Sequence, residues 1–486
     1  MTAPEGPLVI GVDSSTQSTK ALVVDAATGE VVARGQAPHT VTTGAGRESD
    51  PEEWWRALRE AVAQCGRVAG EAAAVSVAGQ QHGLVTLDGD GRPVRPALLW
   101  NDVRSAPQRD RLVDGLGGPE AWAERVGSVP VPAFTVTKWA WLCENEPEAA
   151  KSTAAVRLPH DYLTERLTGL ATTDRGDASG TGWWASSTRS YDEEILDLAG
   201  LPAGALPRVL GPGEAAGTVR DGLEGLLAPG TLVATGTGDN MAAALGLGLR
   251  PGRPVLSLGT SGTVYAVSTR RPADPTGTVS GFADARGDWL PLACTLNCTL
   301  AVDRMAALLS RDREDVEAGG DITALPFLDG ERTPNLPYAT GLLTGLQHAT
   351  TGGQVLQAAY DGAVFALLRA LDLVLGGEPG GTGAAGDGEA PPLTLIGGGA
   401  KGVAWRETVR RLSGRAVHVP RAEELVALGA AAQAAGLLLG EDPAAVARRW
   451  DTAAGASYAP VERDDAALAR LAEVLDDADT LLNRRS

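Results

Sequence analysis

Asp239 is the carboxylate of this sequence whose neighbouring residues most strongly suggest a chemical role. It stands between a strand-like run, residues 232–235, and a small-residue run, residues 241–249, which predicts a closely packed helix. The turn before it, Gly236-Thr237-Gly238, lets backbone N–H groups come close to an anion, because glycine has no Cβ. An aspartate at such a corner can act on a substrate, or it can simply cap the helix. From this stretch alone, the cap is the favoured interpretation.

Turns of similar character follow three other strand-like runs. Residues 8–12 lead to Asp13 and a hydroxyl-rich turn, after which Lys20 opens the second strand of a hairpin. The residues of this first turn are Ser14, Ser15, Thr16 and Gln17. The second turn is Gly259, Thr260, Ser261 and Gly262, and the third is Gly397, Gly398, Gly399, Ala400 and Lys401, before a predicted helix at 403–412. Turns of this kind can hold phosphate oxygens with backbone N–H groups.

These turns and two carboxylates fit phosphoryl transfer from a nucleotide. The reaction requires groups that cradle phosphate oxygens, a cation that neutralises charge, and a base that accepts the proton of the acceptor. Asp13 suits Mg²⁺, which needs only one or two carboxylates besides phosphate oxygens, and Asp239 suits the base. No Walker motif occurs, so the sequence does not predict a P-loop fold.

The elements that position these residues follow a plan that occurs twice. The strand, turn and strand at 8–25 are matched by the same sequence of elements at 254–269, about 245 residues later. Such a duplication indicates two related domains that face one another, although two unrelated hairpins would also explain it. Further strands at 74–78, 84–88 and 98–100 also end in polar residues, which is where ligands bind in α/β sheets.

The residues resemble a known family, the FGGY carbohydrate kinases of the actin-like ATPase superfamily. The Asp13 turn, the turn at 258–262 and the glycine run at 396–401 look like its phosphate and adenosine sites. One family signature matches through 341–346 and 354–361. The other is similar from Thr135 through Lys138 to Asn145, with Ala133 where a Gly, Ser or aromatic residue is more usual.

The resemblance also covers the sugar side. The loops Gly79-Gln80-Gln81-His82-Gly83 and Leu99-Trp100-Asn101-Asp102 are similar to those of members that act on D-xylulose. Two positions differ from the usual pattern, because Gln81 stands where Met is common and Ser15 where Gly is common.

The resemblance implies a role for each matched residue. Asp239 is implied as the catalytic base, and Asp13 as the residue for Mg²⁺ and phosphate. The expected sugar-binding residues are Gln81, His82, Trp100, Asn101, Asp102 and Asn240. The expected nucleotide-binding residues are Ser14, Ser15, Thr16, Gln17, Lys20, Gly259, Thr260, Ser261, Gly398, Gly399, Ala400 and Lys401. Trp100 could instead be structural, and Lys401 a solvated charge.

We therefore expect an α/β protein with two actin-like, ribonuclease H-like ATPase domains facing a central cleft. The predicted domains are 1–247, with the sugar side and Asp239, and 248–486, with the nucleotide side and a flexible insertion at 376–392. The expected reaction is ATP- and Mg²⁺-dependent phosphorylation of D-xylulose. The rivals are another kinase of the family, acting on ribulose, a deoxysugar or a polyol, and a non-enzymatic actin-like protein that binds partners according to its nucleotide state.

Composition limits the remaining possibilities. With 486 residues and a net charge of −19, the chain is long enough for two cores and opposes binding to nucleic acid or anionic lipid. The N-terminus lacks a basic signal region and no apolar run would span a bilayer, which favours a cytoplasmic protein. The four cysteines are expected as reduced thiols. The oligomeric state is open, with a homodimer as one option.

Overall fold

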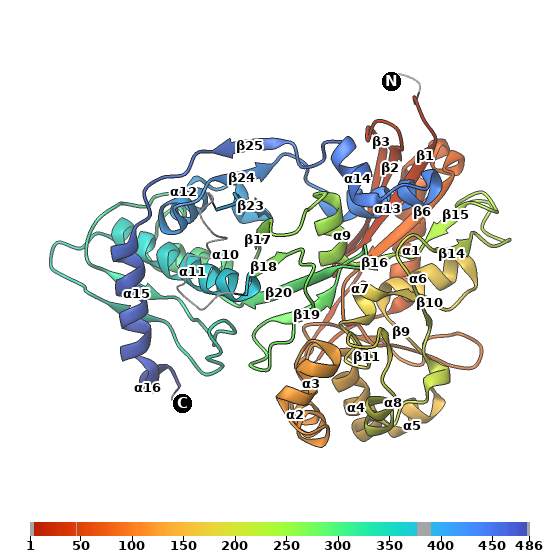
Figure 1. The fold of residues 1–486 in the computed structure, drawn as a ribbon, viewed down its shortest axis with the longest axis horizontal. Coiled ribbons are helices and arrows are strands. Elements are labelled where there is room, and N and C mark those ends of the chain that lie inside the picture. The colour runs from red at the N-terminus through yellow and green to blue at the C-terminus, as the bar shows by residue number, and fades with distance from the viewer. Residues whose placement is uncertain (1–3, 45, 377–389, 484–486) are drawn as a thin grey trace. The chain divides into compact units, whose positions relative to one another are not determined.

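The computed structural model describes residues 4–44, 46–376 and 390–483 and divides the chain into two compact units (Figure 1). Unit 1 comprises Met1–Leu249, Ser268–Leu290 and Ala422–Ala454, and unit 2 comprises Arg250–Val267, Pro291–Arg421 and Gly455–Ser486. Each unit thus draws on segments that are distant in the sequence. Within the insertion expected at 376–392, positions 377–389 lie outside the described residues.

The central sheet of unit 1 has the strand order β14-β15-β6-β1-β2-β3, with β16 also paired to β6. Strand β1 (Leu8–Ser14) pairs antiparallel with β2 (Ser18–Asp25) and parallel with β6 (Ala74–Gly79), which confirms the predicted hairpin and the predicted strand at 74–78. The remaining strands of this sheet are β3 (Val31–Pro38), β14 (Ala215–Thr218), β15 (Leu232–Ala234) and β16 (Thr237–Gly238).

The register of this sheet brings three strand ends together. Asp13 of β1 and Thr237 of β16 both pair with Ala78 of β6, one from each side. All three strands run parallel, so the residues that follow them leave the sheet at the same edge. The turn after Asp13, the loop after Gly79 and the corner at Asp239 therefore share one edge of the unit 1 sheet.

Alternating side chains of β1 fill two cores. Ile10 and Val12 join a cluster with Trp54 and Leu58 of helix α1 (Pro51–Gln64) on one face. Val9 packs on the other face, in a cluster that includes helix α13 (Leu425–Leu439). Helix α1 begins at Pro51, because the Asp50 side chain accepts a hydrogen bond from Glu52 N and proline suits the first turn.

Helix α13 approaches the backbone of its neighbours closely. It packs against β1, β6 and helix α9 (Asp239–Gly246). A Cβ added at Gly429 would collide with the Ala242 carbonyl oxygen, and one at Gly246 with that of Leu425. Glycine at both positions allows α9, and with it Asp239, to lie directly on α13.

The other elements of unit 1 are short. Its helices α2 to α8 and α14 are Ala106–Gly115, Pro119–Val126, Thr135–Asn145, Pro147–Ser152, Pro159–Thr168, Arg175–Ala178, Glu193–Ala199 and Pro443–Arg449. Its strands β4, β5, β7 to β13 and β19 are Thr42–Thr43, Arg47–Ser49, Val85–Leu87, Ala97–Leu98, Ala155–Arg157, Thr172–Asp174, Trp184–Ala185, Ser190–Tyr191, Arg208–Leu210 and Ser280–Ala283.

Unit 2 contains the matching sheet, with the order β20-β18-β17-β23-β24-β25. Its strand β17 (Pro254–Leu258) pairs antiparallel with β18 (Gly262–Ala266) and parallel with β23 (Leu393–Ile396), as β1 does with β2 and β6. The other strands are β20 (Trp289–Thr295), β21 (Thr323–Leu325), β22 (Leu342–Thr344), β24 (Val417–Pro420) and β25 (Gly455–Tyr458). The helices α10, α11, α12, α15 and α16 are Thr299–Leu308, Gly352–Val374, Val403–Ser413, Asp465–Asp477 and Asp479–Leu482. The shared pairing pattern agrees with the predicted duplication.

Several predicted boundaries differ from the structure. The strand expected at 98–100 is the two-residue β8, which ends at Leu98. The strand expected at 84–88 is β7, Val85–Leu87, and the helix expected at 403–412 is α12, which ends at Ser413. Helix α1 is followed by a 3₁₀ helix at Gly66–Glu71. Element ends depend on capping and tertiary contacts, so periodicity places them only approximately.

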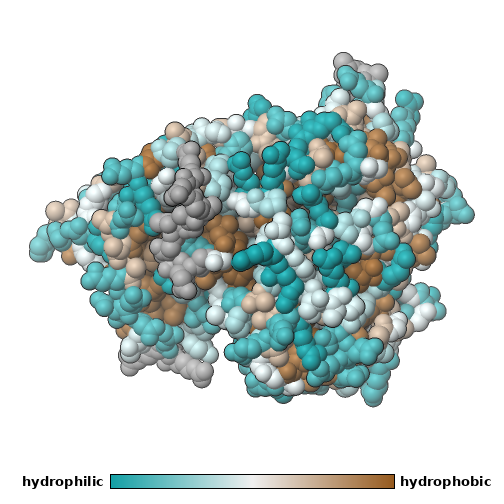
Figure 2. Space-filling view, in the orientation of Figure 1, coloured by the Kyte–Doolittle hydropathy of each residue, from teal (hydrophilic) through white to brown (hydrophobic). Residues whose placement is uncertain are grey.

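The face of the protein in Figure 2 is largely hydrophilic, with apolar residues scattered over it. Among the described residues, no single helix is long and apolar enough to span a membrane, and α13 and α14 meet that test only when taken together across a bend of 112°.

Candidate active site

Asp239 is the first residue of α9, directly after β16. The N-cap position belongs to Gly238, so Asp239 does not cap the helix as the simpler interpretation proposed. Its Oδ1 accepts hydrogen bonds from Asn240 N at 2.8 Å and from Asn240 Nδ2 at 3.0 Å. Burial, followed by the charges of Asp13 and Asp177, raises the pKa of the Asp239 carboxyl to about 7. A carboxylate with this pKa is suited to accept a proton near neutral pH.

Asp13 is buried at the end of β1. Ser15 Oγ donates a hydrogen bond to Asp13 Oδ1 at 2.6 Å, so the serine that replaces the usual glycine contacts this carboxylate. Burial raises the pKa of Asp13 to about 6, against the opposing effects of Ser15 and Lys20. The Lys20 ammonium itself lies 2.6 Å from Glu424 Oε2, which offsets its charge.

Gln81 is joined to Asp239 through Asn240. Asn240 Nδ2 donates both to Gln81 Oε1, at 2.9 Å, and to Asp239 Oδ1. Gln81 Nε2 is buried and has no hydrogen-bond partner among the described residues. The amide therefore has donor capacity left for a ligand hydroxyl.

His82 follows in the same loop with a positive φ of 65°. Its Nδ1 lies 2.8 Å from Gly180 O, and its ring stacks on Phe134 with centroids 5.1 Å apart. A Cβ on Gly180 would lie 2.6 Å from His82 Cε1, so the ring needs glycine beside it. The backbone and the ring of His82 are thus both held by their surroundings.

In the second sugar-side loop, residues 99–102, Trp100 and Asn101 have polar or exposed groups that a ligand could contact, whereas Asp102 already has protein partners. Trp100 is 41% exposed and its Nε1 donates to Thr16 Oγ1 at 3.1 Å, which links this loop to the Asp13 turn. Asn101 Oδ1 is buried without a partner in the described part of the chain. Asp102, by contrast, pairs with Arg104 at 2.7 Å and accepts from Arg47 N, so its carboxylate already has structural partners.

The remaining hairpin residues are held within the turn. Ser14 Oγ lies 3.2 Å from Thr19 Oγ1, and the Gln17 carbonyl accepts from His39 N. The side chain of Gln17 is exposed, unlike those of Ser14 and Thr19.

In unit 2, the two predicted nucleotide-binding turns lie at the end of β17 and share Thr299 as a neighbour. Thr299 donates through N and Oγ1 to the Gly259 carbonyl, and Leu300 N donates to Thr260 O. A Cβ on Gly399 would lie 2.8 Å from Leu258 Cβ and 2.9 Å from Thr299 Cγ2. The structure therefore brings residues 259–261 and Gly398–Lys401 together at the end of β17, with Ala400 buried and Gly398 and Lys401 exposed.

Sequence reasoning missed residues that support Asp239. Gln433 of α13 accepts from Ser76 Oγ at 2.6 Å and exchanges two hydrogen bonds of 3.1 Å with the backbone of Gly236. It thereby fixes the turn before Asp239, where Gly236 has a φ of 77°. A polar residue within the Ala-rich run 427–439 was the signal that could have identified it.

A buried histidine with three acidic neighbours was also missed. His160 Nδ1 lies 2.7 Å from Asp177 Oδ2, and its Nε2 lies 3.3 Å from Asp161 Oδ1 and 3.8 Å from Asp174 Oδ1. Burial alone would lower the pKa of His160, but these carboxylates raise it to about 9. Asp174 also accepts from Thr237 Oγ1 at 2.7 Å, which connects this group to the Asp239 turn.

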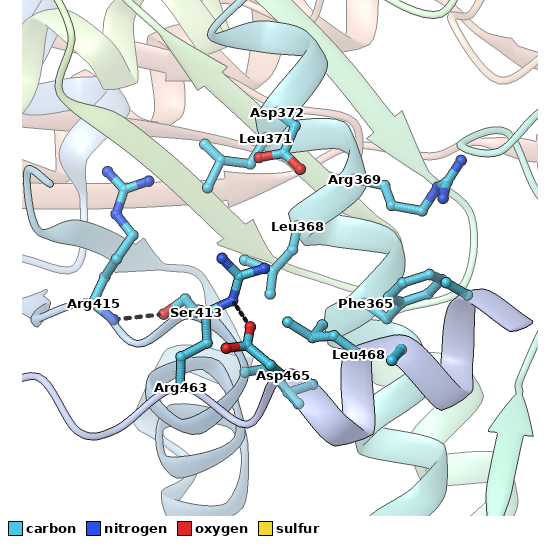
Figure 3. Close-up of a pocket in the computed structure, with 13 residues that line it drawn as sticks. Phe365, Leu368, Arg369, Leu371, Asp372, Ser413, Arg415, Arg463, Asp465 and Leu468 are labelled. Atoms are coloured by element: carbon cyan, nitrogen blue, oxygen red, sulfur yellow. Dashed lines mark hydrogen bonds and ion pairs between the residues drawn. The ribbon is translucent and has the colours of Figure 1, made fainter. Parts of the chain in front are cut away.

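A cavity of about 290 Å³ in unit 2 contains none of the predicted site residues (Figure 3). It is lined by residues of α11 and α15 and by Ser413 and Arg415 at the end of α12, whereas Gly398–Lys401 precedes the start of α12. At about 1.5 Å per residue, the eleven residues of α12 separate the two places by about 16 Å.

The chain is similar to known carbohydrate kinases over nearly its whole length. The models of the FGGY family of carbohydrate kinases match the chain, the N-terminal domain at residues 8–246 and the C-terminal domain at residues 255–437. The xylulose kinases of Streptomyces rubiginosus and Streptomyces coelicolor are 74% and 73% identical over 484 residues, covering 100% of this chain and 99% of each relative. The solved xylulose kinase from Bifidobacterium adolescentis is 37% identical with a TM-score of 0.83, covering 96% of this chain and 99% of that one.

Proposed function

The chain belongs to the FGGY family of carbohydrate kinases, and we propose that it transfers the terminal phosphoryl group of ATP to D-xylulose. ATP is the phosphoryl donor that membership in this kinase family implies. The choice of sugar is supported by full-length relatives that are xylulose kinases. The single observation that carries the chemistry is the position of the Asp239 carboxyl, which stands at the start of α9 and is linked through Asn240 to Gln81.

In the proposed reaction, the C5 hydroxyl of the sugar attacks the terminal phosphorus of ATP. The new O–P bond forms as the bond to the leaving oxygen of ADP breaks, and the hydroxyl proton passes to the Asp239 carboxylate. Gln81 Nε2 and the His82 ring contact sugar hydroxyls, with contributions from Trp100 and Asn101. Asp102 acts by holding this loop through Arg104.

The residues present fit Mg²⁺, which we propose as the metal cofactor. Burial is the main cause of the raised pKa values of Asp13 and Asp239, and the charge of Lys20 is offset by its ion pair with Glu424, so a bound cation would meet carboxylates that favour it. No group of three or more potential ligands that could hold a metal occurs in the described part of the chain. Mg²⁺ commonly uses one or two carboxylates together with substrate phosphates, so Asp13 would suffice on the protein side. When bound, the ion would neutralise phosphate charge.

The nucleotide is proposed to contact the turns at 259–261 and Gly398–Lys401 of unit 2, and Ser14, Ser15, Thr16 and Gln17 of unit 1. The shared position of the two unit 2 turns at the end of β17, both beside Thr299, supports this assignment. The cytoplasmic location and the homodimer expected from the sequence remain predictions.

A sugar panel tests the proposed function. ADP release is measured by a coupled assay with D-xylulose, D-ribulose, a deoxyketose and glycerol, and the phosphorylated product is identified by mass. We expect the highest kcat/KM with D-xylulose and a monophosphate product. A higher value for another sugar would assign the chain to a different member of the family, and ADP release that is independent of any sugar would contradict kinase function.

A further inference from the structure

Lys138 is a buried lysine whose charge no carboxylate neutralises directly. It lies in α4, only 1% exposed, and it forms no ion pair within the described residues. Asp102 is the charge that acts on it, and Asp102 is itself engaged by Arg104. Burial lowers the pKa of the Lys138 ammonium to about 7. Burying an ammonium is costly, so its hydrogen bonds indicate what it does.

The Lys138 ammonium donates to backbone carbonyl oxygens. It contacts His82 O at 3.1 Å, and it forms a short contact with Ala133 O just before the helix begins. Thr135 Oγ1, one turn earlier in α4, donates to the same His82 oxygen at 3.3 Å. Both residues belong to the signature at 133–145, and both point to one atom of the sugar-side loop.

The backbone that these two residues hold is an unusual one. His82 has a φ of 65°, a backbone conformation that residues other than glycine rarely adopt. Its ring is fixed at the other end by Gly180 O and by the Phe134 ring. Because Nδ1 faces a carbonyl oxygen, it must carry the proton in the neutral ring, so Nε2 is then the acceptor nitrogen.

We propose that Lys138 is a positioning residue for sugar recognition: with Thr135 it clamps the His82 carbonyl, holding His82 in the left-handed conformation that presents its ring to a sugar hydroxyl. This inference rests on the proposed contact between His82 and the sugar. It gives the signature around Lys138 a physical role.

The experiment measures the position of His82 separately from the enzymatic reaction. Lys138→Met keeps the length of the side chain but removes the ammonium, and Lys151→Met, at an exposed lysine on α5, is the matched control. The first measurement uses no substrate. The chain has five histidines, and in protein with ¹³C-labelled histidine the Cε1–H signal of His82 is assigned through His82→Gln. We expect Lys138→Met to shift the His82 signal and leave the other four in place.

The second measurement concerns the sugar. Because removing a charge-assisted hydrogen bond changes an equilibrium by about tenfold or more, we expect the KM for D-xylulose to rise at least about tenfold. The KM for ATP should stay within about twofold, since the nucleotide does not depend on the His82 ring, and Lys151→Met should leave both constants unchanged. A general loss of structure would instead lower the melting temperature and affect both substrates.

An unmoved His82 signal, or equal changes in both KM values, would overturn the proposal. If Lys138→Met does not fold, Thr135→Val removes the second donor with little change of shape. The His82 signal and the two KM values are then measured in that variant, with the same expected outcomes. If the wild-type protein does not phosphorylate D-xylulose, the proposed function fails, while the histidine signal still reports whether the clamp exists.

Discussion

The electrostatics of Asp239 depend on individual neighbours. Asp13 and Asp177 both place negative charge near its carboxyl, and the partial burial of the side chain reduces its contact with water. Asp177 in turn is held by His160 at 2.7 Å. A general base needs a pKa near the operating pH, and this arrangement raises the pKa of the Asp239 carboxyl toward that range.

The effect of Asp177 can be measured through pH dependence. Asp239 must be deprotonated to accept a proton, so kcat/KM should fall as the pH drops below about 7. Asp177→Asn removes a like charge, which lowers the pKa of Asp239 and should move this acid limb to lower pH. The control is Asp90→Asn, at an exposed aspartate. An acid limb that stays in place or moves to higher pH in Asp177→Asn, measured in protein with a normal melting temperature, would contradict this account.

Residues at strand ends could be found from the sequence, but their supporting residues could not. Asp13, Gln81 and Asp239 directly follow strand-like runs, so local pattern predicts that they share a sheet edge. Gln433 lies about 200 residues from Gly236, and Lys138 reaches His82 from 56 residues away. Only the fold shows such pairings, because periodicity carries no information about distant partners.

At the scale of elements, the position of Asp239 depends on how α9 lies on α13. The two helices meet at backbone distance through Gly246 and Gly429, and α13 also packs against β1, where Gly11 faces Ala427. The sequence showed an apolar, Ala-rich run at 427–439, but neither its place in helix α13 nor its partners. Its small residues fit this arrangement, since a larger side chain at Gly429 would push α9 away from α13.

This packing predicts a large effect from one methyl group. In Gly429→Ala the new Cβ collides with the backbone of α9. We therefore expect the free energy of unfolding to fall by about 1–3 kcal/mol and the melting temperature to fall with it. Gly70→Ala is the matched control, because a Cβ there meets nothing within 4 Å, and its stability should be unchanged or slightly higher. Equal stability of Gly429→Ala and the wild type in denaturant titrations would show that α9 is not fixed in this way.

At the scale of the whole molecule, chain order and spatial order differ. The duplicated strand plan predicted two sheets of the same pattern, and both are present. A boundary near residue 247 remains a prediction, while segments 268–290 and 422–454 pack with the N-terminal part in unit 1. A linear sequence reading assigns neighbouring residues to one domain, so it cannot foresee a late helix such as α13 returning to the first sheet.

The net charge of −19 also acts on the whole protein. It opposes anionic substrates in general, so we propose that ATP binding relies on local groups, namely backbone N–H donors of the turns and a cation at Asp13. We therefore expect catalysis to depend strongly on a few residues of the site, and most strongly on Asp239.

The most direct test of the account is the turnover of Asp239→Asn with D-xylulose and ATP. We expect binding of both substrates, measured by calorimetry, to stay near the wild-type values, because asparagine keeps the size and the hydrogen bonds of the side chain. D-xylulose-dependent ADP release should fall by about 10²–10⁴-fold, the range typical for the loss of a general base. Turnover within about threefold of the wild type, with both substrates bound, would contradict the assignment of Asp239 as the base on which the proposed reaction depends.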